Sequence, residues 1–387
     1  MAARDLRLDS LRGIFLVIMT IDHIGGKLTA YTYEPFGFVS AAAAFVLLSA
    51  YMYAYTTRNT APTLSALGAQ SRKRAAKLYR YHVALFALLV LLTVLSPIHD
   101  DYLGRQFYPA DMPVWKALFY GVVLVHQPKL MQLLPMYLVL SLASPLMLMA
   151  FRRGWFGLLF GLSFTLWLWG QFFDPLEWLV AVIGTGTQAG DFNLFNWQLL
   201  WVAGLYIGYA HGVEKQKVLV GQPWVLAFAV VMAIGFFLDR HDFVQFADSM
   251  DFYTENPDVR ILRLLNIFCQ VVIFCHLVRF LPADKGLPWF RLLGRYSLPV
   301  FCFHVLVVSF LEPVSWRIGM NFSYAVEVAY LFAVVVSLTL PAVFYRAYER
   351  KMRHAAAATW RSRFLASAQV GRDLFRLGRT MRDKRNA

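Results

Sequence analysis

Two histidines in apolar stretches are the residues of this sequence whose type and position could do chemistry. The first, His23, lies in the run LDSLRGIFLVIMTIDHIGG (8–26), where Asp22 precedes it and Arg12 stands eleven positions earlier. At about 100° per residue, that spacing leaves Arg12 and His23 about 20° apart, so they share one helix face. A rise of about 1.5 Å per residue places them about 16 Å apart along the axis, half of a ~30 Å hydrocarbon core. We therefore expect Arg12 at a membrane surface and His23 near the midplane.

His23 at that depth suits a general base. An ionisable group near the bilayer centre costs about 3 kcal/mol on insertion scales, so it usually serves a function. The unperturbed pKa of histidine is about 6.5, which is close to the optimum for a base that removes a proton from a hydroxyl group. Asp22 could orient His23 or stabilise its charge. Because adjacent helical side chains point about 100° apart, Asp22 could instead contact a neighbouring helix. Thr20 and Lys27 fall on the stripe of His23.

His304 is the second candidate. It lies in GRYSLPVFCFHV (294–305), nine residues after Arg295 and seven after Ser297. On one continuous helix it would lie roughly 13 Å deeper than Arg295, at a depth similar to that of His23, with Ser297 on its face. The alternative interpretation is an interhelical hydrogen bond of the kind that polar side chains make in membranes.

A third polar group lies in FNLFNWQLLW (192–201), where Asn193, Asn196, Trp197 and Gln198 stand at the start of an apolar run. Side-chain amides there could bind the hydroxyl groups of a substrate, and the alternative is capping of the helix, which Asn196 suits. Trp178, in the preceding loop, could stack on a sugar ring or could be an ordinary interfacial anchor.

The composition indicates an all-α polytopic membrane protein. Of the 387 residues, 59% are hydrophobic and 16% are charged, against about 25% charged in a soluble protein. About ten apolar runs approach the length of a membrane span: 13–31, 38–56, 82–97, 132–151, 155–170, 197–211, 224–238, 262–280, 297–312 and 324–346. No cleavable signal peptide, disulfide framework or metal-binding motif is evident, so we expect no metal.

The distribution of charge predicts the topology. With both termini in the cytoplasm, most of the 37 lysines and arginines fall on the cytoplasmic side, as the positive-inside rule requires. The net charge of +14 therefore indicates a basic cytoplasmic face that contacts anionic lipid, not nucleic acid. We divide the chain into a transmembrane domain (1–346) and a basic cytoplasmic tail (347–387), whose pattern predicts an amphipathic helix.

Four segments resemble the OpgC family, within the acyltransferase-3-like superfamily of membrane acyltransferases. LDSLRG followed by Asp22-His23 is similar to the first helix of that superfamily, which carries an arginine, ten residues and a histidine. SAAAAFVLLSAYMYAY (Ser40–Tyr55), FNWQLLWVAGLYIG (Phe195–Gly208) and LGRYSLPVFCFHV (Leu293–Val305) resemble later segments of the family. One departure is in the second helix, where the family pattern has an acidic residue and Ser-Gly and this chain has Ala43 and Ser49-Ala50.

The resemblance implies a multi-pass enzyme of the bacterial inner membrane that transfers a succinyl group from succinyl-CoA to a hydroxyl of periplasmic glucans. For such a reaction we assign catalysis to His23, Asp22 and His304, and we expect the glucan near Asn193, Asn196, Trp197, Gln198 and Trp178. The phosphates of CoA would need the basic inner face, where the candidates are Arg12, Arg72, Lys73, Arg74, Arg80, Arg295 and Ser297. Transfer could be direct, which we favour, or could pass through an acyl-histidine. Two alternative functions stay open: an O-acetyltransferase of another envelope polysaccharide, and a glycan or lipid transporter. A homo-oligomer also stays open.

Overall fold

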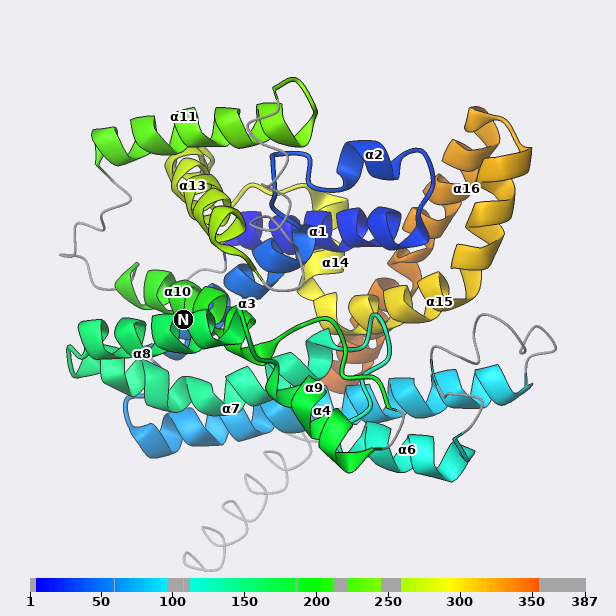
Figure 1. Ribbon diagram of the computed structural model, residues 1–387, viewed down its shortest axis with the longest axis horizontal. Helices are drawn as coiled ribbons and strands as arrows, with labels where there is room; N and C mark the ends of the chain where they lie inside the picture. The colour runs from blue at the N-terminus through cyan, green and yellow to red at the C-terminus, as the bar shows by residue number, and fades with distance from the viewer. Residues whose placement is uncertain are drawn as a thin grey trace, which may run out of the picture.

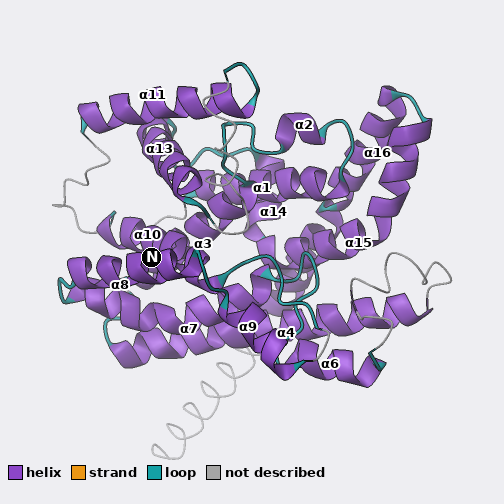
Figure 2. Cartoon of the chain, in the orientation of Figure 1, coloured by secondary structure: helices purple, strands orange, loops and turns teal. Residues whose placement is uncertain are grey.

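Helices make up the described part of the protein, and Figure 2 shows no strand among those residues. The structure, a computed structural model, describes residues 5–58, 60–95, 107, 112–184, 187–211, 222–244 and 259–354. The helices are α1 (Leu6–Ile24), α2 (Thr29–Thr32), α3 (Ala41–Thr57), α4 (Leu64–Leu95), α6 (Val114–Val122), α7 (Leu133–Arg152), α8 (Phe156–Gly170), α9 (Pro175–Ile183), α10 (Leu194–Ala210), α11 (Pro223–Arg240), α13 (Ile261–Leu277), η3 (Val278–Phe280), α14 (Pro288–Arg295), α15 (Ser297–Asn321) and α16 (Tyr324–Ser337).

Several of these helices are long and apolar enough to cross a membrane. Within the described residues, five qualify singly by length and composition, and up to seven if each of two bent pairs, α8 with α9 and α14 with α15, counts as one span. The protein is therefore a helical membrane protein, while ten spans and two cytoplasmic termini stay predictions. The predicted amphipathic helix of the tail falls mostly beyond residue 354, outside the described residues.

Helix α1 lies in the middle of the fold, with α11 and α13 to one side and α15 and α16 to the other (Figure 1). It packs backbone to backbone on α14. A Cβ atom added at Gly13 would collide with the main-chain carbonyl of Phe290, and one added at Gly294 would collide with that of Asp9. Small residues at such crossings let membrane helices approach closely. The short helix α14 thereby fixes the position of α1 and the start of α15.

The second close crossing joins α3 to α10. Gly204 and Gly208 of α10 face the carbonyls of Leu47 and Tyr51 and the methyl groups of two alanines on α3, Ala50 and Ala54. This is a small-residue seam of the GxxxG type. Ala50, where the family pattern has glycine, therefore lies in a helix contact. Ala43 is buried in the first turn of α3, where its N–H donates to the N-cap hydroxyl of Ser40.

Replacing Gly204 with valine is expected to destabilise the protein by about 3 kcal/mol, since overpacking a well-filled contact costs about 1–3 kcal/mol or more. The added side chain meets main-chain atoms of α3, which cannot rotate away. Thermal unfolding in detergent measures the effect. The matched control is Gly161→Val on α8, where a Cβ atom meets nothing within 4 Å. Equal melting temperatures for the two variants would contradict the tight α3–α10 contact.

His126, between α6 and α7, forms hydrogen bonds with two other segments of the chain. It is buried, its Nε2–H donates to the carbonyl of Phe107 at 2.9 Å, and its Nδ1 accepts from the backbone N–H of Gln188 at 3.2 Å. Burial lowers the pKa of the His126 imidazole, and the bond to Phe107 opposes that shift only in part.

Because the pKa of His126 is lower in the folded chain, the unfolded chain binds the extra proton first as the pH falls. Stability contributed by neutral His126 is therefore expected above its unfolded pKa of about 6.5 and to decline below that value. We expect His126→Gln to be less stable at pH 7 and to lose less stability between pH 7 and 5 than the parent. Thermal unfolding at the two pH values measures this, and identical pH slopes would contradict it.

Three helix boundaries differ from the sequence expectation. Helix α1 ends at Ile24 because Gly25 and Gly26 have φ of 76° and 105°, values that suit glycine. Lys27 therefore lies beyond the helix and not on the stripe of His23, which corrects that prediction. Helix α4 begins at Leu64, well before the predicted start at residue 82. Arg295 and His304 do not share one helix, because α14 and α15 meet at 90° on either side of Tyr296.

Candidate active site

His23 and His304 lie side by side, one on α1 and the other on α15. Nδ1 of His23 is 3.1 Å from Nε2 of His304, and the ring centroids are 5.2 Å apart. On its other side, Nδ1 of His304 lies 2.9 Å from the hydroxyl of Thr20, one turn before His23 on α1. The structure thus brings together the two predicted histidines and adds Thr20 to them.

The two histidines differ in accessibility. His304 is fully buried, whereas His23 keeps partial exposure. Of the pair, only His23 can therefore meet a substrate without rearrangement of the fold. His304 is placed to act on His23, and its interhelical hydrogen bond is the contact that the alternative interpretation expected.

Asp22 does not contact the imidazole of His23. Its carboxylate accepts a hydrogen bond of 2.6 Å from the hydroxyl of Thr32, at the end of α2. It therefore follows the second of the two expectations for this residue, a contact with a neighbouring segment. The turn after α1 is braced from α16, where the buried carboxylate of Glu327 accepts from the backbone N–H of Lys27.

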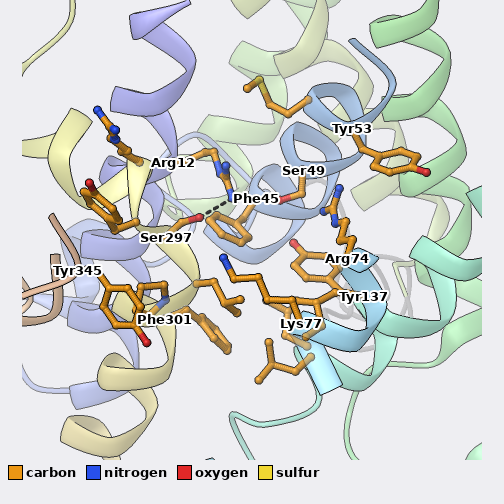
Figure 3. A pocket seen from close by; sticks show the side chains of 18 of the residues that line it. Arg12, Phe45, Ser49, Tyr53, Arg74, Lys77, Tyr137, Ser297, Phe301 and Tyr345 are labelled. Atoms are coloured by element: carbon orange, nitrogen blue, oxygen red, sulfur yellow. Dashed lines mark hydrogen bonds between the residues drawn. The ribbon is translucent and has the colours of Figure 1, made fainter. Parts of the chain in front are cut away.

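A pocket of 380 Å³ opens beside the Arg12 end of α1, between α1, α3, α4, α7 and α15 (Figure 3). Four of the predicted donor-binding residues line it: Arg12, Arg74, Arg295 and Ser297. Arg12 donates from Nη2 to the hydroxyl of Ser297 at 2.5 Å, and its guanidinium lies 5.6 Å from the ring centre of Phe45. The first turn of α15 holds Ser297 there, and Pro299 is tolerated in that turn because its missing N–H leaves no intrahelical bond broken.

Arg74 is held between aromatic rings. Its guanidinium lies 5.1 Å from the ring of Tyr53 and 5.5 Å from that of Trp201. Trp201 is fixed in turn by a 2.9 Å hydrogen bond to Ser144 of α7. Among the described residues no carboxylate forms an ion pair with Arg74. Arg74 lines the pocket as a cation that stacks on aromatic rings. This arrangement suits the binding of an anion.

Glu349 is the carboxylate that lines this pocket. It accepts from Arg295 at 3.3 Å and from the phenol of Tyr296 at 3.0 Å. Arg80, another predicted donor ligand, lies on the exposed side of α4, where it bonds to the carbonyl of Ala76 and does not line the pocket. The pocket is thus rimmed by three arginines and Lys77, with one acidic group at its edge.

Phe301 separates the pocket from the histidine pair. It lines the pocket, and its ring lies 5.9 Å from that of His304. Arg12 and His23 mark the two ends of this region on α1, about 16 Å apart by helix rise. Ser297 and His304 mark the same region on α15, about 10 Å apart. The cations and the candidate base therefore lie at different depths along the same two helices.

The side-chain amides at the start of α10 form hydrogen bonds with α8. Asn193 caps α10, accepting from the N–H of Phe195, so the cap is Asn193 and not Asn196. Both asparagines donate to the carbonyl of Gly170, and Gln198 bonds to Ser163 of α8. Trp197 is fully buried, while Trp178 on α9 is 56% exposed. None of these five predicted substrate ligands lines the pocket or contacts the histidine pair in the described structure.

Several pocket residues escaped the sequence analysis. Lys77, three residues after Arg74, shares its helix face, and this spacing could have indicated it. Tyr137, Tyr345 and Glu349 gave no such signal, and Ser49 was noted only in the Ser49-Ala50 departure from the family pattern. The helix that contains α16 continues to His354, and this carries Tyr345 and Glu349 to the pocket. Within the described ranges, no group of three or more metal-ligating side chains gathers.

Comparison with known proteins identifies one family. A family model described as OpgC protein matches residues 4–350. The match spans the pocket, both histidines and the continuation of α16 as far as Glu349. No curated protein and no solved structure matches the chain.

Proposed function

We propose that this chain, which belongs to the OpgC family of acyltransferases, transfers a succinyl group from cytoplasmic succinyl-CoA to hydroxyl groups of periplasmic glucans across the bacterial inner membrane. The observation that supports it most is the pair of His23, which is partly exposed, and His304. The two helices that carry this pair also line the cationic pocket. The pocket suits an anionic donor, and the histidine suits deprotonation of a hydroxyl group.

In this proposal the phosphates of succinyl-CoA bind at Arg12, Arg74, Lys77 and Arg295. These residues lie on the side of the membrane that the positive-inside rule predicts to be cytoplasmic. The thioester arm passes Phe301 and reaches His23. There His23 removes the proton from a glucan hydroxyl, the oxygen attacks the thioester carbonyl, and the carbon–sulfur bond breaks. The proton then passes from His23 to the departing CoA thiolate.

Mass spectrometry of periplasmic glucans from strains with and without the protein tests this function. We expect glucans that carry succinyl groups only in the strain that has the protein. Acetylated glucans would instead support the O-acetyltransferase alternative. Unmodified glucan that crosses vesicles containing the purified protein, without thioester consumption, would support the transporter and contradict the proposal.

A further inference from the structure

The hydroxyl of Thr20 carries one proton, and two hydrogen-bond contacts decide where that proton is directed. Thr20 donates to the carbonyl of Leu16, four residues earlier on α1, at 2.7 Å. Toward Nδ1 of His304, 2.9 Å away, the same hydroxyl can then only accept. The proton of neutral His304 is therefore on Nδ1, and its Nε2 is left as an acceptor.

The same reasoning continues to His23. Nε2 of His304 faces Nδ1 of His23 at 3.1 Å. Since a neutral imidazole carries one N–H, the proton of His23 is on Nδ1 and donates to His304. Nε2 of His23 is left with its lone pair, and it belongs to the one ring of the two that is partly exposed.

We infer that Thr20 is a positioning residue that acts through His304 to hold His23 in the tautomer whose Nε2 accepts the substrate proton. This inference rests on the proposed function, because it assigns a role at the same site. The opposite tautomer of His23 would present an N–H to the substrate hydroxyl and could not remove its proton. In the reaction, Nε2 of His23 takes the hydroxyl proton and later delivers it to the CoA thiolate. While His23 is protonated, its Nδ1–H still donates to the lone pair of His304, which stabilises the charge.

The kinetics of purified full-length variants with succinyl-CoA and glucan test this role. Thr20→Val keeps the shape of the fully buried Thr20 and removes its hydroxyl. We expect kcat to fall about tenfold, the loss that corresponds to one net hydrogen bond favouring the reactive tautomer. The KM for succinyl-CoA should stay unchanged because Thr20 does not line the pocket. Thr20→Ser keeps the hydroxyl and should restore kcat. Thr20→Ala repeats the test if the valine variant folds poorly.

Ser309→Ala is the matched control. Ser309 is buried on α15 and makes the same bond to the carbonyl four residues earlier, at 2.7 Å, without contacting a histidine. We expect its kcat to equal that of the parent. A wild-type kcat for Thr20→Val beside an inactive His23→Ala would overturn the role of Thr20 and leave the proposed function standing. Equal losses in Thr20→Val and Thr20→Ser would also overturn it. An active His23→Ala would overturn both.

Discussion

Replacing His23 with alanine is expected to lower kcat for succinyl transfer by about a thousandfold, because general-base catalysis contributes about 10² to 10⁴. The remaining imidazole, His304, is fully buried, so we do not expect it to meet the substrate and replace His23. The variant should still insert and bind donor, because the cationic pocket does not include His23. Steady-state rates of glucan succinylation measure the loss.

His276→Ala on α13 serves as the matched control for His23→Ala, since His276 has no contact with the histidine pair or the pocket. Its rate should equal that of the parent. Retained succinylation in His23→Ala would contradict the assignment of the base. Rapid-quench mass spectrometry of the parent adds a second test, because an acyl-histidine adduct would replace direct transfer with a covalent intermediate.

Replacing Arg74 with methionine is expected to raise the KM for succinyl-CoA about a hundredfold. Removing one partner of a buried charge pair costs about 2–5 kcal/mol, and about 3 kcal/mol corresponds to that factor. Methionine fills the space between Tyr53 and Trp201 without a charge. The kcat at saturating donor should change little, because Arg74 lies in the pocket and His23 at another depth.

The stability of Arg74→Met should move in the opposite direction from its donor affinity. A cation held in aromatic surroundings without a carboxylate destabilises the unliganded protein, so the methionine variant should melt at a higher temperature. Arg153→Ala, an exposed arginine that stacks on Trp155, is the control for loss of one positive charge. An unchanged KM in Arg74→Met, or a KM raised equally in Arg153→Ala, would contradict a donor site in this pocket.

The histidine pair was within reach of sequence reasoning. Arg12 and His23 lie on one helix, as the spacing predicts, and the depth argument paired His304 with His23 through similar distances from two basic residues. The depth argument placed His304 correctly although one of its premises was wrong, because Arg295 belongs to α14 and not to α15. Its reference point should have been Ser297, which begins α15 and bonds to Arg12.

Other features depend on contacts between distant segments, which spacing cannot supply. The bend at Tyr296 arises where α14 packs on α1 through Gly13 and Gly294, and the hydropathy of 288–312 alone does not reveal it. The start of α4 was missed because its first part is polar, and hydropathy detects only the apolar remainder. The polar stretch at 193–198 was ambiguous between capping and binding, and the structure shows capping and helix-to-helix bonds for its amides.

Proteoliposomes with glucan on one side and succinyl-CoA on a chosen side test the central claim most directly. The account predicts that mass spectrometry will find succinylated glucan only when the donor is on the membrane side of the Arg12 pocket and the glucan on the other. It also predicts that His23→Ala forms this product about a thousandfold more slowly than the parent. Succinylation by His23→Ala at the rate of the parent, or equal transfer with donor and glucan on either side, would contradict it.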